Sequence, residues 1–361
     1  LLVPEKTKVA ETLDEFRAAH KYNFLDEHLR AFNAEVPILV QWDDHEVVNN
    51  WSPSLDLRRD QRYRIKDLKL LAATAARAFR EYSPMPLEGF DEAGTLYRRV
   101  PYGPMLDLFV LDMQTYRGPN SHNLQTEAGE DTAFLGAAQI AWLKQELLAS
   151  TAQWKVIVAG MPIGTNVADG HDAQGRVKWQ GVANGDDGAP KGREIELADL
   201  LSFIKRHAIH DIVWLCADVH YTAAHYFDPT QAAYPDFLPF WEFVSGPLHA
   251  GTFGPGELDN TFGPEVKFVK APGAGRQNLP PSAGMQFFGH VRIDGASGRM
   301  TVTLRDRADN ALGRFGQRLF KPPGEFRAFY ERISTSNPGA FTPAYEALGR
   351  GELDSVGALS P

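Results

Sequence analysis

Short apolar runs alternate along this chain with longer segments in which apolar residues recur at helical spacing. A run of aliphatic and aromatic residues that stops at a polar residue is typical of a buried strand, whereas recurrence every three to four positions is typical of an amphipathic helix. Regular alternation of the two patterns favours an α/β fold. The runs that predict strands are 36–40, 106–111, 154–159, 212–217 and 240–244.

Helical spacing is found in four segments. In the first, charged residues between the apolar ones indicate a solvent-facing helix or a pair of helices. The second has an alanine-rich centre that allows close packing, and Pro84 and Pro86 end it. The predicted helices are 13–32, 58–82, 139–149 and 194–206.

Two further segments have no sustained apolar period. Residues 164–192 are rich in Gly, Asp and Asn, which predicts a long loop near a functional site. Residues 248–283 form a second excursion, rich in Gly and Pro. The runs 287–293 and 300–305 flank the turn-forming segment 294–298 and predict a terminal hairpin.

Composition limits the class of protein. The 361 residues are 43% hydrophobic and 23% charged, which is typical of one large globular domain or two unequal ones. A net charge of −9 without a basic stripe argues against a nucleic-acid-binding surface. No run approaches the ~20 apolar residues that span a bilayer. Cys216 is the only cysteine, so an intrachain disulfide is excluded, and the start at Leu1 predicts a truncated or processed chain.

A dense polar cluster directly follows the first predicted strand. Trp42–Glu46 contains three carboxylates and the imidazole of His45, and two asparagines, Asn49 and Asn50, come shortly after. Adjacent charged groups are rarely desolvated unless they are paired or bind an ion. Carboxylate, amide and imidazole ligands suit a hard or borderline cation. The composition therefore predicts a metal site.

A second polar cluster follows the predicted strand 212–217. Here Asp218 and His220 stand two positions apart. In an extended chain they would point the same way, about 7 Å apart at their backbones. We therefore expect an oxygen and a nitrogen ligand from the end of one strand.

The predicted strands end in Asp43, Asp112, Gly160, Asp218 and Ser245. Ligands in open α/β sheets bind beyond the carboxyl ends of the strands. We expect these polar ends to converge in one cleft, although an arrangement that splits them between two sheets stays open.

The same residues also fit ordinary structural roles. Asp43–Glu46 would suit a solvated turn or a helix N-terminus, where acids favour the helix dipole. Asp218 and His220 would suit a hydrogen-bonded pair at a strand end. Arg117 beside a turn would suit an ion pair with Asp112.

Other candidates are weaker. His225 and His249 flank possible site loops, but a lone histidine is more often packed or exposed. Asn184, Asp186 and Asp187 would suit calcium, but these residue types also form ordinary turns, which is the interpretation we favour.

Three motifs in order resemble the PhoD-like alkaline phosphatase and phosphodiesterase family, a branch of the calcineurin-like metallophosphoesterases. They are Trp42–Val47 with Asn49 and Asn50, Leu111–Asn120, and Ala217–Tyr221. The resemblance covers roughly 7–319. It implies an αββα fold, a β-sandwich flanked by helices, in a catalytic domain over 1–321 that lacks its N-terminal part, followed by an irregular tail over 322–361.

The resemblance also implies a dinuclear centre with iron and calcium as the suggested ions. Asp43 and Asn50 match ligand positions in the first motif, and Asp218 and His220 match the ligand pair in the last. We add Asp44 as a further metal-ligand candidate. The implied partner is a small-molecule phosphate ester, the implied location is periplasmic or extracellular, and the oligomeric state is left open.

The sequence departs from the family pattern at three places. No Gly-Asp motif, whose Asp bridges two metals in the family, precedes Asp43. Gln114 stands where the family often has Arg, and Gly160 replaces a polar residue before Met161 and Pro162.

Phosphate esters resist hydrolysis because the anionic phosphorus centre repels hydroxide. Two metal ions ~3.5–4 Å apart neutralise the oxygens and lower the pKa of water towards ~7. We predict that His45 donates a hydrogen bond or proton to the leaving oxygen. We predict that Arg117 donates two hydrogen bonds to the phosphate.

The leading hypothesis is a metal-dependent hydrolase of phosphate monoesters or diesters. The alternative is a non-catalytic fragment or pseudoenzyme of the same family that binds at most one metal. A third hypothesis is a metal-dependent hydrolase of amides.

Overall fold

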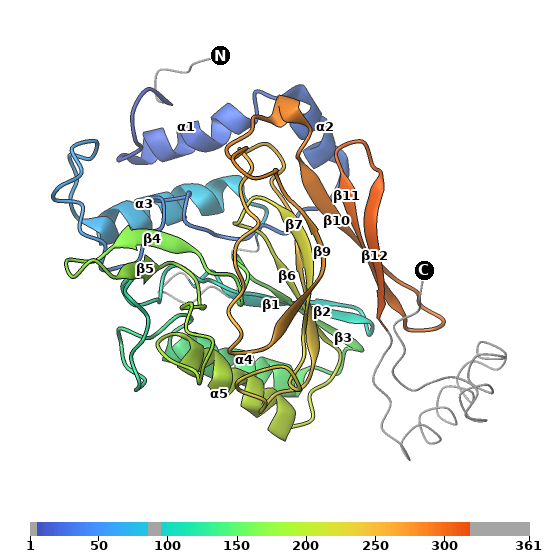
Figure 1. Cartoon of the computed structure of the whole chain (residues 1–361). Coiled ribbons are helices and arrows are strands. Elements are labelled where there is room, and N and C mark those ends of the chain that lie inside the picture. The colour runs from blue at the N-terminus through green and yellow to red at the C-terminus, as the bar shows by residue number, and fades with distance from the viewer. Residues whose placement is uncertain (1–5, 86–94, 318–361) are drawn as a thin grey trace, which may run out of the picture.

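The computed structural model describes residues 6–85 and 95–317 and places them in a mixed α/β fold around a large sheet (Figure 1). The predicted α/β class is therefore confirmed. The predicted tail, 322–361, lies outside the described residues.

The large sheet has seven strands in the order β1-β2-β3-β6-β8-β7-β9. Its centre, β2 to β8, consists of parallel pairs, and β1, β7 and β9 pair antiparallel to their neighbours. Parallel strands end at the same edge of a sheet, so the polar residues that follow them lie together. The strands are β1 (Arg98–Tyr102), β2 (Leu106–Val110), β3 (Trp154–Val158), β6 (Ile212–Cys216), β7 (Thr222–Phe227), β8 (Phe240–Val244) and β9 (Pro264–Lys270).

The apolar runs predicted four of these strands to within one residue, namely β2, β3, β6 and β8. Their neighbouring residues point to opposite faces of the sheet. Phe109, Ile157 and Trp214 are in register across three strands and face a core that includes helices α4 (Ala137–Ala149) and α5 (Glu194–Arg206). One layer of helices thus covers this face.

A three-stranded sheet covers the opposite face. Val156 and Val213 pack there against Met300, Val302 and Leu304 in one apolar cluster. The predicted hairpin is confirmed as its first two strands. The strands of this sheet are β10 (Phe287–Ile293), β11 (Met300–Asp306) and β12 (Ala311–Gln317).

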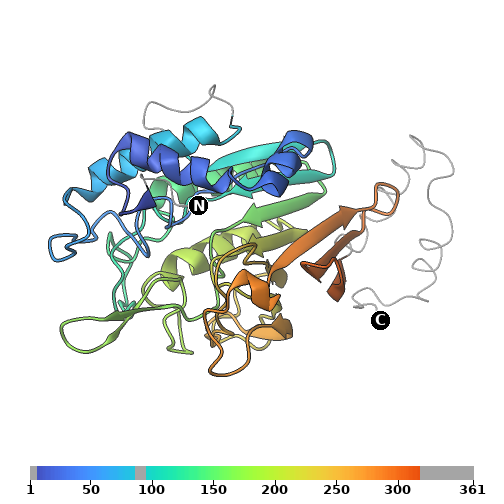
Figure 2. The ribbon, with the colours of Figure 1, turned by 90° about the horizontal axis from the view of Figure 1, so that it is seen from above.

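Three helices precede the sheet and lie together at one side of the molecule (Figure 2). Thr12 begins the first helix with a capping box, and Asp26 and Asp67 cap the next two through their side chains. The predicted helix over 58–82 is shorter than expected, because residues 58–66 form turns and irregular backbone before the N-cap Asp67. These helices are α1 (Leu13–Asn23), α2 (Glu27–Glu35) and α3 (Leu68–Tyr82).

The prediction of a buried strand over 36–40 is wrong. Among the described residues the segment pairs with no strand, and the side chains of Val36 and Leu39 are 40% and 52% exposed. The side chain of Gln41 instead donates to the carbonyl oxygens of Leu111 and Val158, at the ends of β2 and β3. An apolar run does not become a strand without a neighbouring strand to satisfy its backbone.

The segments predicted as loops contain strands. The segment 164–192 carries a small hairpin, β4 (Ala168–His171) with β5 (Val177–Trp179). The segment 248–283 contains β9 and the 3-10 turn η2 (Pro281–Ala283). In the parts of the chain that the structure describes, every helix is too short or too polar to cross a bilayer.

Candidate metal centre

Three carboxylates from two distant parts of the chain meet at the carboxyl edge of the large sheet. Asp43, Asp44 and Asp218 each offer an oxygen atom within 4.8 Å of the others. Asp44 is buried, and the other two are partly buried. The predicted convergence of the two polar clusters is therefore present in the structure.

Two hydrogen bonds hold Asp43. Its backbone N–H donates to Glu46 Oε2 over 2.9 Å, and Gln114 Nε2 donates to its Oδ1 over 2.8 Å. A Cβ atom built on Gly160 would lie 3.1 Å from the same Oδ1. At two positions where the sequence departs from the family pattern, Gln114 thus donates to this oxygen atom and Gly160 leaves room for it.

Asp44 organises the turn that follows it. Its backbone carbonyl accepts from the N–H groups of Val47 and Val48, and its Oδ2 accepts from the N–H of Asn50 over 2.7 Å. Asn50 has a φ of 53°, which non-glycine residues rarely adopt. The Asp44 carboxylate and this backbone conformation bring Asn50 back toward the acidic cluster.

The prediction that Asp218 and His220 extend a strand is wrong. β6 ends at Cys216, and both residues have positive φ values, 62° and 60°, in the tight connection to β7. The extended-chain argument fails because β7 returns antiparallel to β8 after only a few residues. Strained backbone of this kind is concentrated at functional sites.

His220 is oriented by a backbone carbonyl. Its Nδ1 lies 2.5 Å from the carbonyl oxygen of Gly251, which accepts hydrogen bonds but cannot donate one. The proton of neutral His220 is therefore on Nδ1, and Nε2 keeps a free lone pair, as in many metal-binding histidines. Among the described residues, however, His220 is not part of the three-carboxylate cluster.

The electrostatics of the cluster favour a cation. Burial, with the neighbouring Asp44 carboxylate, raises the pKa of Asp218 to about 7. Burial, followed by the charges of Asp218 and Asp44, also raises the pKa of Asp43 well above its ordinary value. Crowded carboxylates resist ionisation unless a positive charge joins them. The donor set, with oxygen ligands and a free imidazole nitrogen nearby, fits a hard or borderline metal ion.

Arg117 interacts electrostatically with the cluster and is 3% exposed. Its Nε and Nη2 donate to the carbonyl oxygen of Trp51, and its Nη1 donates to that of Gln180. Asp112 accepts instead from the backbone N–H groups of Gln114 and Thr115. The alternative Arg117–Asp112 hydrogen-bonded pair is absent from the described residues, and the phosphate-binding role of Arg117 stays a prediction.

His45 occupies the open side of the site. Its side chain is 71% exposed, and its Nε2 lies 3.8 Å from Asp44 Oδ1. This position leaves the imidazole accessible to an incoming molecule.

Sequence reasoning missed a polar network beside the cluster. Asn50 Nδ2 donates to Asp169 Oδ1, and Asn120 Nδ2 donates to Asp169 Oδ2. Arg193, which is 1% exposed, donates to Asn120 Oδ1 and to five backbone carbonyl oxygens. Asn120 stood within a recognised motif, whereas nothing local distinguishes Asp169 in a segment rich in Gly, Asp and Asn.

The weaker candidates have structural partners. The N–H of Asn260 donates to Asp187, and Asp186 pairs with Lys191, as expected of turn-forming residues. His225 is buried in β7 with its Nδ1 2.9 Å from Glu242 Oε1.

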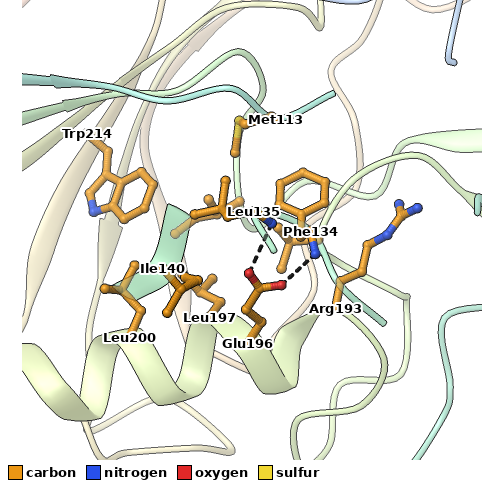
Figure 3. Close-up of a pocket in the computed structure, with 11 residues that line it drawn as sticks. Met113, Phe134, Leu135, Ile140, Arg193, Glu196, Leu197, Leu200 and Trp214 are labelled. Carbon is orange, nitrogen blue, oxygen red and sulfur yellow. Dashed lines mark hydrogen bonds between the residues drawn. The ribbon is translucent and has the colours of Figure 1, made fainter. Parts of the chain in front are cut away.

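Two cavities lie near the site, and none of the three clustered carboxylates lines either of them. One, of about 10 Å³, lies between apolar side chains of α4, α5 and Trp214 and has room for at most a single water molecule (Figure 3). There Glu196 accepts from the N–H groups of Phe134 and Leu135, and the guanidinium of Arg193 points away. The other, of about 380 Å³, lies between α3, Trp42 and Trp51.

The fold and the site define an α/β protein with an acidic cluster that could hold a metal ion, at the carboxyl edge of the parallel centre of a mixed sheet. The model of the PhoD-like phosphatase family matches residues 2–304. The chain therefore belongs to the PhoD-like phosphatase family, as its motifs predicted.

Individual relatives agree with this assignment. The chain is 29% identical to alkaline phosphatase D of Bacillus subtilis (strain 168) over 222 residues, which are 58% of this chain and 35% of the relative. A solved structure of PhoD superposes with a TM-score of 0.59 at 18% identity, covering 87% of this chain and 59% of the other. The chain thus spans about a third of its curated relative.

Proposed function

We propose that this chain is a metal-dependent hydrolase of phosphate monoesters or diesters, an alkaline phosphatase or phosphodiesterase of the PhoD type. The observation that carries the proposal is the convergence of Asp43, Asp44 and Asp218 at the carboxyl edge of the sheet. Family membership supplies the reaction class. By resemblance, the complete fold is an αββα sandwich, and the protein acts in the periplasm or outside the cell.

The residues that would hold the metal are the three carboxylates together with Asn50 and His220. By resemblance the ions are iron and calcium in a dinuclear centre. Bound cations of this kind supply Lewis acidity and a stronger water nucleophile. The protein contributes a fixed set of ligand atoms, because hydrogen bonds from Gln114 and Asn50 hold the carboxylates in place.

His45 is placed so that it could protonate the leaving group. Its side chain is exposed and stands beside the carboxylates rather than among them. We assign it the transfer of a proton to the departing oxygen atom, which needs an accessible imidazole within hydrogen-bond reach.

Arg117 contributes positive charge. Its guanidinium acts on Asp44, Asp43 and Asp218, and the burial of the group lowers its pKa to about 10, so it stays charged at neutral pH. This charge reduces the repulsion between the acidic cluster and an anionic ester. Backbone carbonyl oxygens of loops already accept hydrogen bonds from its Nε, Nη1 and Nη2. A long-range electrostatic effect on the ester is therefore better supported than direct hydrogen bonds from Arg117 to the phosphate.

The test measures metal content and turnover of the purified chain. Elemental analysis gives the number of ions per chain, and 4-nitrophenyl phosphate, bis(4-nitrophenyl) phosphate and an anilide substrate report the reaction. Asp218→Asn should remove metal and turnover together. The matched control is Asp199→Asn on the exposed side of α5, where the carboxylate pairs with Lys144. Undiminished hydrolysis by Asp218→Asn, or hydrolysis of the anilide alone, would contradict the proposal.

A second candidate function has its own support. The three clustered carboxylates suffice for one ion, and His220 lies outside them. The alternative is a non-catalytic member or fragment that binds at most one metal. Two ions per chain with ester turnover favour the enzyme, whereas one or none without turnover favours this alternative.

A further inference from the structure

Asn50 has three of its four polar groups in use. Its N–H donates to Asp44 Oδ2 over 2.7 Å, and its carbonyl oxygen accepts from Asn120 Nδ2 over 2.9 Å. Its Nδ2 donates to Asp169 Oδ1 over 2.8 Å. Among the described residues, the side-chain Oδ1 is the group left without a partner.

The contact with Asp169 decides which way this amide points. An amide group presents an acceptor on one side and donors on the other, and its orientation follows from its hydrogen-bond partners. An ionised carboxylate only accepts, so the NH₂ side of Asn50 must face Asp169. The oxygen side then faces away from Asp169.

We propose that Asp169 is a positioning residue that fixes the amide of Asn50 with its oxygen atom free to bind a cation. The inference rests on the proposed function for the role of Asn50 as a ligand, and it adds a residue that acts through that ligand. Partners that orient the ligands of a metal typically change its affinity 10–100-fold when they are removed.

A second amide orients Asp169 itself. Arg193 Nη2 donates to Asn120 Oδ1 over 3.0 Å, and a guanidinium cannot accept. The NH₂ side of Asn120 must therefore face the opposite way, where it donates to Asp169 Oδ2 over 2.9 Å and to the carbonyl oxygen of Asn50. Arg193, Asn120, Asp169 and Asn50 thus form a chain of hydrogen bonds in which the donor and the acceptor of each bond are fixed.

The hairpin of β4 and β5 delivers Asp169 to this position. Trp179, at the end of β5, forms an isolated β-bridge with Ser121. The carbonyl oxygen of Trp179 also accepts a hydrogen bond from Arg193 Nη1. Lys178 Nζ lies 3.3 Å from Asp169 Oδ2 and balances part of its charge. The hairpin is therefore tied to the loop that carries Asn120.

The first test is a titration of the purified chain with Mn²⁺. Calorimetry and electron paramagnetic resonance measure the affinity. Asp169→Asn should weaken Mn²⁺ binding roughly 10–100-fold, because the new amide no longer compels Asn50 to present its oxygen. Asp172→Asn is the matched control. This carboxylate lies on the same hairpin and accepts from Gln174 and Arg176 but has no contact with Asn50.

A double substitution gives a sharper result. In an Asn50→Asp background both side-chain oxygens are ligands, and Asp169 becomes a repelling neighbour. Asp169→Asn should then strengthen Mn²⁺ binding instead of weakening it. Equal losses in Asp169→Asn and Asp172→Asn, or the same sign in both backgrounds, would overturn the inference.

A readout without metal separates this inference from the proposed function. In the metal-free protein, the side-chain NH₂ signals of Asn50 should exchange slowly with solvent, and Asp169→Asn should abolish that protection. Fast exchange in the unsubstituted chain would refute the positioning role. Protected signals in a chain that binds no metal would instead refute the proposed function and leave the orientation of the amide intact.

Discussion

Arg117 and Arg193 donate hydrogen bonds to the same acceptor, the backbone carbonyl oxygen of Gln180, over 3.2 Å and 2.6 Å. Both guanidinium groups are buried, and burial lowers the pKa of Arg117 to about 10 and that of Arg193 to about 9, with the neighbouring Arg117 adding to the second effect. Their other acceptors are Asn120 Oδ1 and the backbone carbonyl oxygens of Trp51 and of residues 118, 119, 179 and 181. Buried donors thus tie together the loops around the candidate metal centre.

The stability of these loops should depend on the shape of the Arg193 side chain as well as on its charge. Arg193→Lys keeps the charge but cannot reach the six acceptors of the guanidinium, and each buried carbonyl left unpaired costs about 1–3 kcal/mol. We expect a loss of at least about 3 kcal/mol in the free energy of unfolding, measured by denaturant titration. Arg176→Lys, at a half-exposed ion pair, should change it little. Equal stability of the two variants would contradict this account.

The acidic cluster should destabilise the metal-free protein. Asp218 has a pKa raised to about 7, so its contribution to stability is complete below its ordinary pKa near 4 and is lost as the pH rises through about 7. In EDTA above that pH, Asp218→Asn should raise Tm by removing repulsion from Asp43 and Asp44. With saturating Mn²⁺ the order should reverse, because the variant has lost a ligand. Scanning calorimetry with and without the ion checks this, and an unchanged order would count against a metal site.

Gly160 leaves room for the carboxylate of Asp43. A Cβ atom there would lie 3.1 Å from Asp43 Oδ1, which is closer than ordinary van der Waals contact. Gly160→Ala should therefore displace this ligand by a few tenths of an ångström and weaken Mn²⁺ binding, with little effect on the fold. Gly295→Ala is the control, because a Cβ atom built there meets no atom within 4 Å. Isothermal titration of both variants measures the difference, and equal affinities would show that the contact is unimportant.

A buried carboxyl pair away from the metal centre should produce a pH-dependent stability. Burial, with the neighbouring Asp259, raises the pKa of Glu194 to about 9. The folded state therefore holds a proton that the unfolded chain releases near pH 4.5, so stability falls as the pH rises from about 4.5 through about 9.

Substitution of Glu194 isolates this effect. Glu194→Gln resembles the protonated form and still accepts a hydrogen bond from Asn184 Nδ2. We expect the Tm of this variant to exceed that of the unsubstituted chain by an amount that grows with pH, in a series of thermal melts. Glu127→Gln, at an exposed position, should show no such trend. A constant difference across the series would mean that Glu194 does not carry the proton.

The local pattern of residues was sufficient for the central strands and several helices. The runs that became β2, β3, β6 and β8 place apolar residues on both faces of the sheet, which is typical of buried parallel strands and is visible without knowledge of their partners. α5 was predicted with its observed ends, since its charged residues separate a clear apolar face. β7 and β9 were missed because their burial depends on pairing with β8 and with each other.

The sequence by itself determined the candidate chemistry of this protein: a polar cluster with three carboxylates, a second one with an aspartate and a histidine, each next to an apolar run, and the motifs of one phosphatase family. The tertiary structure alone decided how these side chains are oriented and which further side chains reach them. Asp169 and Arg193 carry no local signal, and they reach the Asn120 of the second motif and Asn50 only because a hairpin and the start of α5 fold against the same loop. The residue type determines which atoms can bind a metal, and the residue type is given by the sequence. The orientation of those atoms depends on hydrogen-bond partners that are distant in sequence and are brought close only by folding.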